Sequence, residues 1–254
     1  MTTRNRQDHW QYLFAPHSVA LIGASNTPGS WGYAIMQRLL ASAKRNVYPV
    51  NPAVSEVLGI ATYDSVTNIP DSIDLAVIVV SAPRVPTIMQ QCVRKGIKAV
   101  VVVSGGFAET GEQGRKLEAE LIRIARQGGV RFIGPNSMGH ANTSSQLSIL
   151  AWTLEIAPGP VALISQSGNY GHRIIRSGMS SGFGFSKFIS TGNEADLHLE
   201  DYLEYLAQDE NTKIITAYIE GLREGRHFFR LAKETTIRKP VLAIKAGRTK
   251  ESAK

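Results

Sequence analysis

The chain has 254 residues, of which 43% are hydrophobic and 19% charged, the composition of an ordinary globular protein with room for two domains. No apolar run approaches the roughly 20 residues of a membrane helix, and residues 1–14 are too polar for a signal peptide, so we expect a cytoplasmic protein with no membrane partner. The formal net charge of +7 favours an anionic ligand. Because the basic residues are scattered and not grouped with aromatic residues, we do not expect a nucleic-acid partner.

The single cysteine, Cys92, falls within an apolar helical pattern. We therefore expect a buried thiol, and no disulfide or cysteine-based metal site. A nucleophilic role for this thiol is the less favoured alternative.

A glycine-rich turn connects the first predicted strand to the first predicted helix. The apolar run Val19–Ile22 is typical of a buried parallel strand, and Tyr33–Leu40 has helical spacing of its apolar residues. Between them, Gly23, Gly29 and Gly32 allow the backbone to turn and to approach a ligand closely. Because the N–H groups that open a helix attract anions, this arrangement predicts a phosphate-binding turn. A tight turn without a ligand is the alternative.

The spacing of these glycines argues against a dinucleotide. The dinucleotide fingerprint spans about six residues and expects an acidic residue about 20 positions further on. Here the glycines span ten residues, and the second predicted strand, Asn46–Val50, ends in Asn51 and Pro52 without a carboxylate. An NAD-dependent dehydrogenase on the same fold is therefore the weaker enzyme hypothesis.

The same alternation of strand and helix continues to residue 133. Further strands are predicted at Leu75–Val80, Ala99–Val103 and Val130–Ile133, and helices at Val85–Arg94 and Gly111–Gln127. Apolar strands that alternate with amphipathic helices form parallel βαβ units, so we expect a Rossmann-like, doubly wound α/β sheet. Ligands then bind at the carboxyl ends of the strands.

Residues 140–160 interrupt this rhythm and end in Pro158-Gly-Pro, which predicts a linker between two domains, residues 1–145 and 158–254. A second, smaller α/β sheet follows. Its strands are predicted at Val161–Ile164, Ser186–Ser190, Lys213–Ile219 and Val241–Lys245, and its helices from residue 168 to about Met179, at Leu199–Ala207 and at Gly225–Thr235. It has a glycine-containing turn of its own, Ser165-Gln-Ser-Gly.

Six motifs in this order resemble the NDP-forming acyl-CoA synthetases, relatives of the succinyl-CoA synthetase alpha subunit. They are the run from Ser18 to Ser25 with Pro28-Gly-Ser, Val47-Tyr-Pro-Val-Asn-Pro, Ser104-Gly-Gly-Phe-Ala-Glu-Thr-Gly, Gly134-Pro-Asn-Ser, Ser165-Gln-Ser-Gly and Lys245-Ala-Gly-Arg. The resemblance covers nearly the whole chain. It implies a CoA-binding first domain and a flavodoxin-like second domain that takes part in phosphoryl transfer.

The resemblance also implies a reaction and its partners. Members of the family interconvert acyl-CoA, ADP and phosphate with free acid, ATP and CoA, through an acyl phosphate and a phosphohistidine. An ATP-grasp domain or subunit supplies the site for ATP, ADP and Mg. We therefore expect CoA or acyl-CoA as ligand and a homo- or hetero-oligomer as the assembly.

By the same resemblance, three groups of residues form the CoA site. The CoA diphosphate would be wrapped by Gly23, Ala24, Ser25, Pro28, Gly29 and Ser30, and the adenosine end would be bordered by Val50, Asn51 and Pro52. The pantetheine channel would be lined by Ser81, Ala82, Pro83, Ser104, Gly105 and Gly106, with Asn136 near the thiol. A structural turn after Pro135 is an equally good explanation for Asn136.

In the second domain, Ser165, Gln166, Ser167 and Gly168 match the turn that holds the phosphate, where backbone N–H groups and the helix dipole would stabilise a phosphorylated intermediate. A simple N-cap serine is the alternative. Glu220, at the end of a predicted strand, matches the family glutamate that holds the reactive histidine. A surface carboxylate is the alternative there.

The family's reactive histidine has no counterpart in this sequence. It lies in a Ser-His-Thr-Gly motif after the Lys-Ala-Gly-Arg strand, beyond the last residue, Lys254. Among the six histidines, His9 and His17 precede the predicted fold, His172, His198 and His227 fall in or beside helices, and His140 is expected to be structural. The polar tail from Thr249 to Lys254 favours a piece of a longer synthetase over two alternatives, a non-catalytic CoA sensor and the regulatory half of a protein acetyltransferase.

Overall fold

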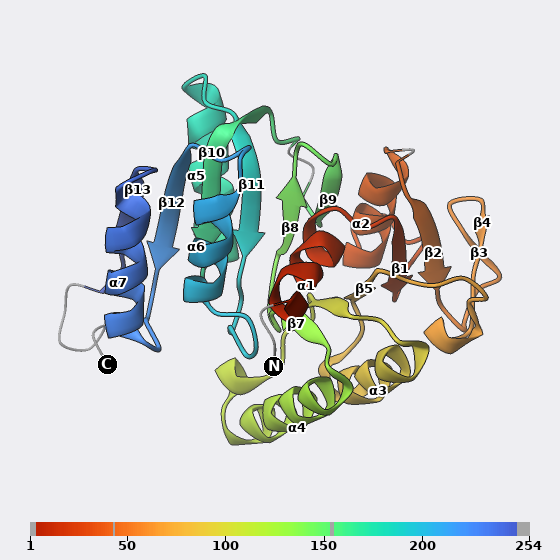
Figure 1. The fold of residues 1–254 in the computed structure, drawn as a ribbon. Coiled ribbons are helices and arrows are strands. Elements are labelled where there is room, and N and C mark those ends of the chain that lie inside the picture. Colours follow the sequence, from red (N-terminus) through yellow and green to blue (C-terminus); the bar gives the residue numbers. More distant parts are fainter. Residues whose placement is uncertain (1–3, 43, 153–154, 248–254) are drawn as a thin grey trace.

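The computed structural model describes residues 4–42, 44–152 and 155–247, and it contains two main β-sheets with helices packed on them (Figure 1). The tail from Thr249 to Lys254 lies outside the described residues. Within the described part of the chain, no helix is both long and apolar enough to cross a membrane.

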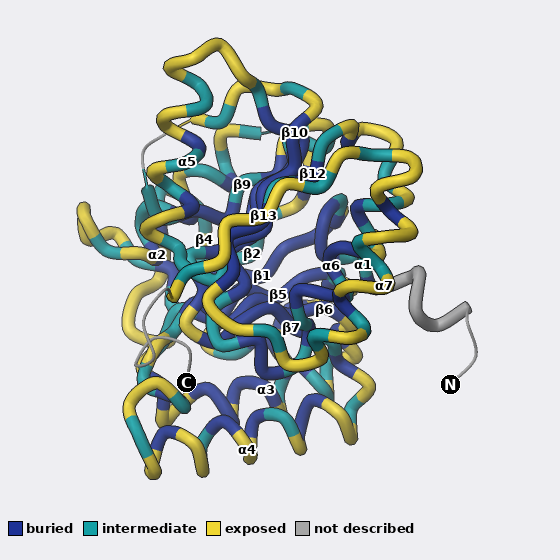
Figure 2. The backbone as a smooth tube through the Cα atoms, turned by 90° about the vertical axis from the view of Figure 1, so that its left-hand side faces the viewer, coloured by how far each residue is buried: buried dark blue, intermediate teal, exposed yellow. Residues whose placement is uncertain are grey.

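The first sheet is parallel throughout and has the strand order β2-β1-β5-β6-β7. Its helices α3 and α4 lie together on one face (Figure 1), and each is buried mainly on the side that faces the strands (Figure 2). The elements are β1 (Ser18–Ile22), α2 (Trp31–Leu40), β2 (Asn46–Val50), β5 (Leu75–Ile78), α3 (Val85–Lys95), β6 (Ala99–Val102), α4 (Glu112–Gly128) and β7 (Arg131–Ile133), with a small hairpin of β3 (Glu56–Val57) and β4 (Ile60–Ala61). The predicted α/β class and its strand-helix alternation are confirmed.

The thiol of Cys92, on α3, is fully buried, and burial raises its pKa to about 12. The buried thiol expected from the helical pattern is therefore confirmed.

The second sheet has the order β13-β12-β10-β11-β8-β9, in which β8 and β9 run antiparallel to their neighbours. Its elements are β8 (Gly139–Asn142), β9 (Leu147–Leu150), β10 (Pro158–Ser165), α5 (Gly168–Ser180), β11 (Phe185–Ser190), α6 (Leu199–Gln208), β12 (Ile214–Ile219), α7 (Gly225–Thr236) and β13 (Val241–Lys245).

The predicted linker at residues 140–160 is wrong for most of its length. The hairpin β8-β9 extends the second sheet, and Pro158-Gly-Pro begins strand β10. The hairpin is fixed to the first sheet by Arg45, whose guanidinium donates to the carbonyl oxygens of Ser145 (2.7 Å) and Gln146 (3.0 Å). In the described part of the chain the second sheet has six strands and the first has five, so the expectation of a smaller second sheet is wrong.

Helix α1 (Arg4–Phe14), which the sequence patterns did not predict, lies between the two sheets (Figure 1). Its last residues bind the hairpin: His140 Nε2 lies 2.6 Å from the carbonyl oxygen of Leu13, and Asn142 Nδ2 donates to that of Phe14 at 2.8 Å. His9 is therefore not outside the fold, as expected above, but lies buried in α1.

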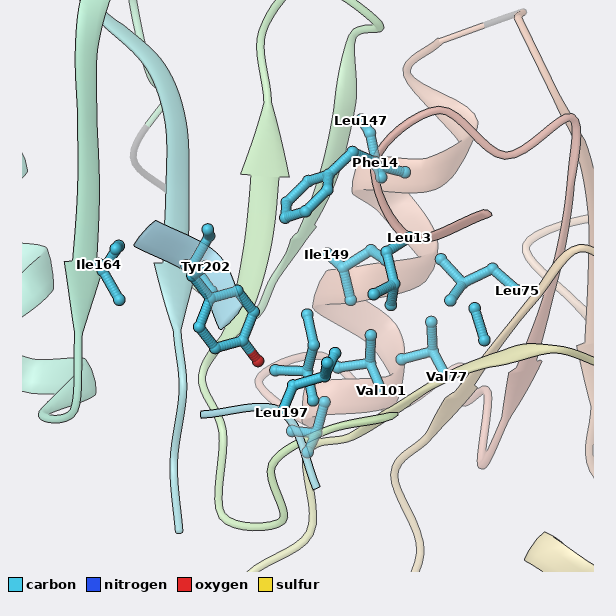
Figure 3. Packing of buried hydrophobic residues seen from close by; sticks show 14 of the residues in the cluster. Leu13, Phe14, Leu75, Val77, Val101, Leu147, Ile149, Ile164, Leu197 and Tyr202 are labelled. Carbon is cyan, nitrogen blue, oxygen red and sulfur yellow. The ribbon is translucent and has the colours of Figure 1, made fainter. Parts of the chain in front are cut away.

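One hydrophobic cluster crosses from the first sheet to the second. It contains Leu75, Val77 and Val101 of the first sheet, Ile149 of the hairpin and Tyr202 of α6 (Figure 3). Helix α2 packs against the same cluster and against β9. The loops at the carboxyl ends of both sheets are therefore held in a fixed relation to each other.

Candidate functional site

The first sheet offers a binding crevice where its strand order reverses, between β1 and β5. Chain connections leave these two strands in opposite directions, and the crevice outside their carboxyl ends is the usual ligand site of a doubly wound sheet. Gly23 follows β1 here, and Val79 and Val80 follow β5. A Cβ atom at Gly23 would lie 2.5 Å from the carbonyl oxygen of Val79, so only glycine fits.

The glycine-rich turn leads directly into the N-terminus of α2. Ser30 caps this helix by accepting a hydrogen bond from the N–H of Tyr33 at 3.2 Å. Gly32 packs so closely on the carbonyl group of Gly23 that a Cβ atom would collide with it. Trp31 and Gly32, in the first turn of α2, line the crevice, and N–H groups at such a helix start have no intrahelical acceptor and can bind an anion.

The second sheet has an equivalent position between β10 and β12. Gln166, after β10, accepts hydrogen bonds from the N–H groups of Glu220 (2.6 Å) and Gly221 (2.9 Å), and its side-chain amide donates to the Gly221 carbonyl oxygen at 2.8 Å. Three hydrogen bonds from one carboxamide thus fix the turn that carries Glu220 beside the N-terminus of α5. Ser167 caps α5 through a 3.4 Å hydrogen bond from Tyr170 N–H.

A single cleft of about 760 Å³ joins these two positions. Loops of the first sheet and the turn before α5 both line it. The predicted residues that line it are Gly23, Ser25, Ser30, Ser104, Gly105, Asn136, Gln166, Ser167, Gly168 and Glu220. A second space of about 260 Å³ adjoins it at Gly23, and Val50, Asn51 and Pro52 line that one. The structure therefore brings both predicted turns and the predicted glutamate together.

Other predicted residues contribute to the backbone of the turns and do not line either space. Ala24 and Ser165 are buried, Pro28, Gly29, Ser81 and Pro83 are exposed, and Ala82 packs beneath Gly106. The Ser165 hydroxyl donates to the carbonyl oxygen of Ser167 at 2.6 Å, which stabilises the turn before α5 from inside. The binding roles of all these residues stay predictions.

The smaller space also has a cationic residue that the motifs did not indicate. Arg84 lines it together with Asn51 and Pro52. No motif marks this arginine, but its place just after the Ser81 turn, beyond the carboxyl end of β5, is a signal that could have found it.

The cleft is lined by one charged side chain among the described residues, Glu220. None of the six histidines lines it, although all six lie within the described part of the chain. His140, the one nearest in sequence to the Gly134 loop, is fully buried, and burial lowers its pKa to about 4. His140 has the structural role expected above, because its ring binds the carbonyl oxygen of Leu13 at the end of α1. His172 stacks on Trp152, with ring centroids 4.5 Å apart.

Comparison with known proteins assigns a family to each half of the chain. Residues 17–143 match the model of the CoA binding domain, and residues 158–254 match that of the succinyl-CoA ligase like flavodoxin domain. The chain is 44% identical to the alpha subunit of ADP-forming acetate–CoA ligase II of Pyrococcus furiosus over 96% of its own length and 53% of that protein. It is 37% identical to the ADP-forming 4-hydroxybutyrate–CoA ligase of Nitrosopumilus maritimus over 95% of its own length and 35% of that protein.

Solved structures agree with this assignment. A protein of Pyrococcus horikoshii superposes with a TM-score of 0.90 at 45% identity, over 96% of this chain and 56% of the other. An acetyl-coenzyme A synthetase of Ca. Korarchaeum cryptofilum, solved in complex with phosphate and ADP, superposes with a TM-score of 0.92 at 37% identity, over 97% of this chain and 53% of the other. The chain spans about half the length of these proteins. It belongs to the family of NDP-forming acyl-CoA synthetases, with a CoA-binding domain followed by a succinyl-CoA ligase-like flavodoxin domain.

Proposed function

We propose that this chain is the CoA-binding and phosphate-binding portion of an ADP-forming acid–CoA ligase that acts in the cytoplasm. The observation that carries the proposal is the shared cleft, which is lined by the turn before α2, the turn before α5 and Glu220. Two of the relatives named above are ADP-forming ligases that join an acid, acetate or 4-hydroxybutyrate, to CoA, and such a reaction can run in either direction. Both directions require a CoA thioester and a phosphate group to meet in one place.

The residues of the two turns suit different phosphate groups. The first-turn N–H groups of α2 and the side chain of Arg84 suit the CoA phosphates, because both offer positive charge to an anion. The N–H groups that open α5 suit inorganic phosphate. With phosphate held there, one of its oxygens attacks the thioester carbonyl carbon, the C–S bond breaks, and acyl phosphate and the CoA thiolate result.

We propose that a histidine outside these 254 residues then accepts the phosphoryl group from the acyl phosphate and passes it to ADP. The support is that no histidine of this chain lines the cleft, whereas Glu220 does. A carboxylate there can orient an imidazole ring and stabilise its positive charge. We further propose that an ATP-grasp domain or subunit binds the nucleotide with Mg, and that the assembly is an oligomer, because the relatives include alpha subunits.

Radioactive labelling of the histidine from ATP tests this proposal. The 254-residue chain alone should not incorporate phosphate. A chimera that joins it to the remaining half of an ADP-forming relative, with the ATP-grasp partner added, should be labelled. In that chimera Glu220→Gln should lower the labelling rate by roughly 10²-fold, because the variant keeps the shape and removes the charge.

The control is Glu234→Gln, which changes an exposed carboxylate on α7. Full-rate labelling of the Glu220 variant, or labelling of the 254-residue chain itself, would show that another histidine carries the phosphate. An unlabelled chimera that still binds CoA would favour the sensor alternative.

A further inference from the structure

Asn193 lies in the loop after β11 and contacts the CoA side of the cleft through its side-chain amide. Its Nδ2 donates to Glu109 Oε2 at 2.5 Å and to Glu118 Oε2 at 2.8 Å. The other oxygen of Glu109 accepts hydrogen bonds from the N–H groups of Gly106 (2.6 Å) and Phe107 (3.1 Å). Asn193 therefore holds, through Glu109, the backbone of the loop that follows β6.

The same residue contacts the turn after β7. Asn136, which lines the cleft, donates from Nδ2 to Asn193 Oδ1 at 3.3 Å. The Asn193 N–H donates to the carbonyl oxygen of Pro135 at 2.9 Å. Gly192, just before it, packs so closely on Pro135 and Asn136 that a Cβ atom there would collide with the Pro135 carbonyl.

On the phosphate side, Asn193 is tied to the turn that carries Glu220. Arg223, three residues after Glu220, donates from Nη2 to the Asn193 carbonyl oxygen at 3.2 Å. Every polar group of Asn193 is thus used, and the bonds run to three separate loops of two sheets.

An asparagine suits this position for electrostatic reasons. Burial alone would raise the pKa of Glu109, but the hydrogen bonds from Asn193 and from the Gly106 and Phe107 backbone outweigh burial and lower it. A carboxylate in place of the amide would lose both donated bonds and add a negative charge beside Glu109 and Glu118. Alanine would leave the carboxylates of Glu109 and Glu118 without the hydrogen bonds that Asn193 Nδ2 donates.

We infer that Asn193 is a positioning residue that couples the CoA side of the cleft to the phosphate side. This inference rests on the function proposed above. Ordering of the loop after β6 by CoA is transmitted through Glu109 and Asn193 to Arg223, and so to the Glu220 turn, which sets the separation between thioester and phosphate.

Amide hydrogen exchange on the 254-residue chain tests the inference. Without ligand, Asn193→Ala removes the side-chain amide that binds Glu109 but keeps the backbone carbonyl that Arg223 binds, so it should speed exchange at Gly106 and Phe107 by roughly 10-fold, the effect of losing hydrogen bonds to a charged group. Unchanged exchange at Gly106 and Phe107 in this variant would overturn the coupling. Arg223→Gln is a second variant at an exposed position, which should speed exchange at Glu220 and Gly221 only.

Repeating the exchange measurement with saturating CoA distinguishes a positioning role from a merely structural one. In the unchanged chain and in the control Asn68→Ala, an exposed asparagine, CoA should slow exchange at Glu220 and Gly221. Both Asn193→Ala and Arg223→Gln should abolish that slowing while still binding CoA in calorimetry. CoA-dependent slowing that persists in both variants would overturn the inference. Failure of the unchanged chain to bind CoA would instead overturn the proposed function, and the ligand-free comparison would still decide whether Asn193 bridges the loops.

Discussion

Gly29 adopts a left-handed backbone conformation, with φ of +83°, at a place where an added Cβ atom would meet no protein atom. The position is exposed, in the turn predicted to wrap the CoA diphosphate. A side chain there would strain the backbone by about 1–2 kcal/mol, and if the turn wraps the diphosphate as predicted, it would also obstruct that ligand. Comparison with the same substitution at a second glycine of similar conformation separates backbone strain from obstruction of the ligand.

Gly29→Val should raise the dissociation constant for CoA by about 10-fold or more, measured by calorimetry, because the side chain blocks the approach to the turn. The matched control is Gly129→Val at the end of α4, where φ is +66° and an added Cβ atom also meets nothing. Both variants should lose similar stability. Equal CoA affinity in the two would place the diphosphate elsewhere.

Glu194, next to Asn193, is a buried carboxyl group whose Oε1 has no hydrogen-bond partner among the described residues. Burial, reinforced by the charge of Glu200, raises its pKa from 4.5 to about 7. The folded state therefore keeps a proton that the unfolded state releases above pH 4.5. The stability contributed by this proton is complete below that pH and is lost as pH rises through about 7.

The unfolding free energy should consequently fall by about 3 kcal/mol between pH 4.5 and pH 8 in the unchanged chain, relative to Glu194→Gln, which has no proton to lose. Urea titrations across this pH range measure the difference. Glu234→Gln, an exposed control, should follow the unchanged chain. Parallel pH profiles for the Glu194 variant and the unchanged chain would mean that Glu194 does not titrate in this range.

Among the elements, helix α1 shows how tertiary contacts decide a structure that local pattern does not predict. Its sequence is polar, and its apolar residues gather at its end, where Leu13 and Phe14 enter the core. Phe14 stacks on Tyr205 of α6 with ring centroids 4.9 Å apart. The helix therefore links the first sheet to the second.

Phe14→Ala should destabilise the chain by about 3–5 kcal/mol, the usual effect of removing a buried aromatic ring. Phe229→Ala on α7, where the ring is 71% exposed, should change stability by less than about 0.5 kcal/mol. Chemical denaturation compares the two. A small loss for Phe14 would mean that α1 is not part of the stable fold.

The other elements could likewise be predicted where the local apolar pattern decides their structure, and not where tertiary contacts do. The central strands are continuous apolar runs, so their positions could be predicted. Hairpin β8-β9 could not, because it contains the polar residues His140 and Asn142, which are buried where they bond to the end of α1. In the site, glycine turns carry recognisable motifs. Arg84 and Asn193 belong to no motif, and their importance depends on loops that only the folded chain brings together.

For the molecule as a whole, the shared core explains why the two sheets act as one scaffold for the cleft. Buried residues of β1, β5, β9, β10 and α6 belong to one cluster. The domain boundaries at residues 1–145 and 158–254 stay a prediction. The first of them would cut the hairpin between β8 and β9, and would expose buried side chains of β9 such as Leu147 and Ile149.

The central claim is that the cleft binds CoA and not a dinucleotide, and calorimetric titration of the 254-residue chain with CoA and with NAD tests it most directly. The turn after β1 is longer than the dinucleotide fingerprint, and β2 is followed by Asn51 and Pro52, with no ribose-binding carboxylate. CoA should therefore bind with one site per chain, and NAD should bind at least about 10-fold more weakly or not at all. Tighter binding of NAD than of CoA would contradict the account.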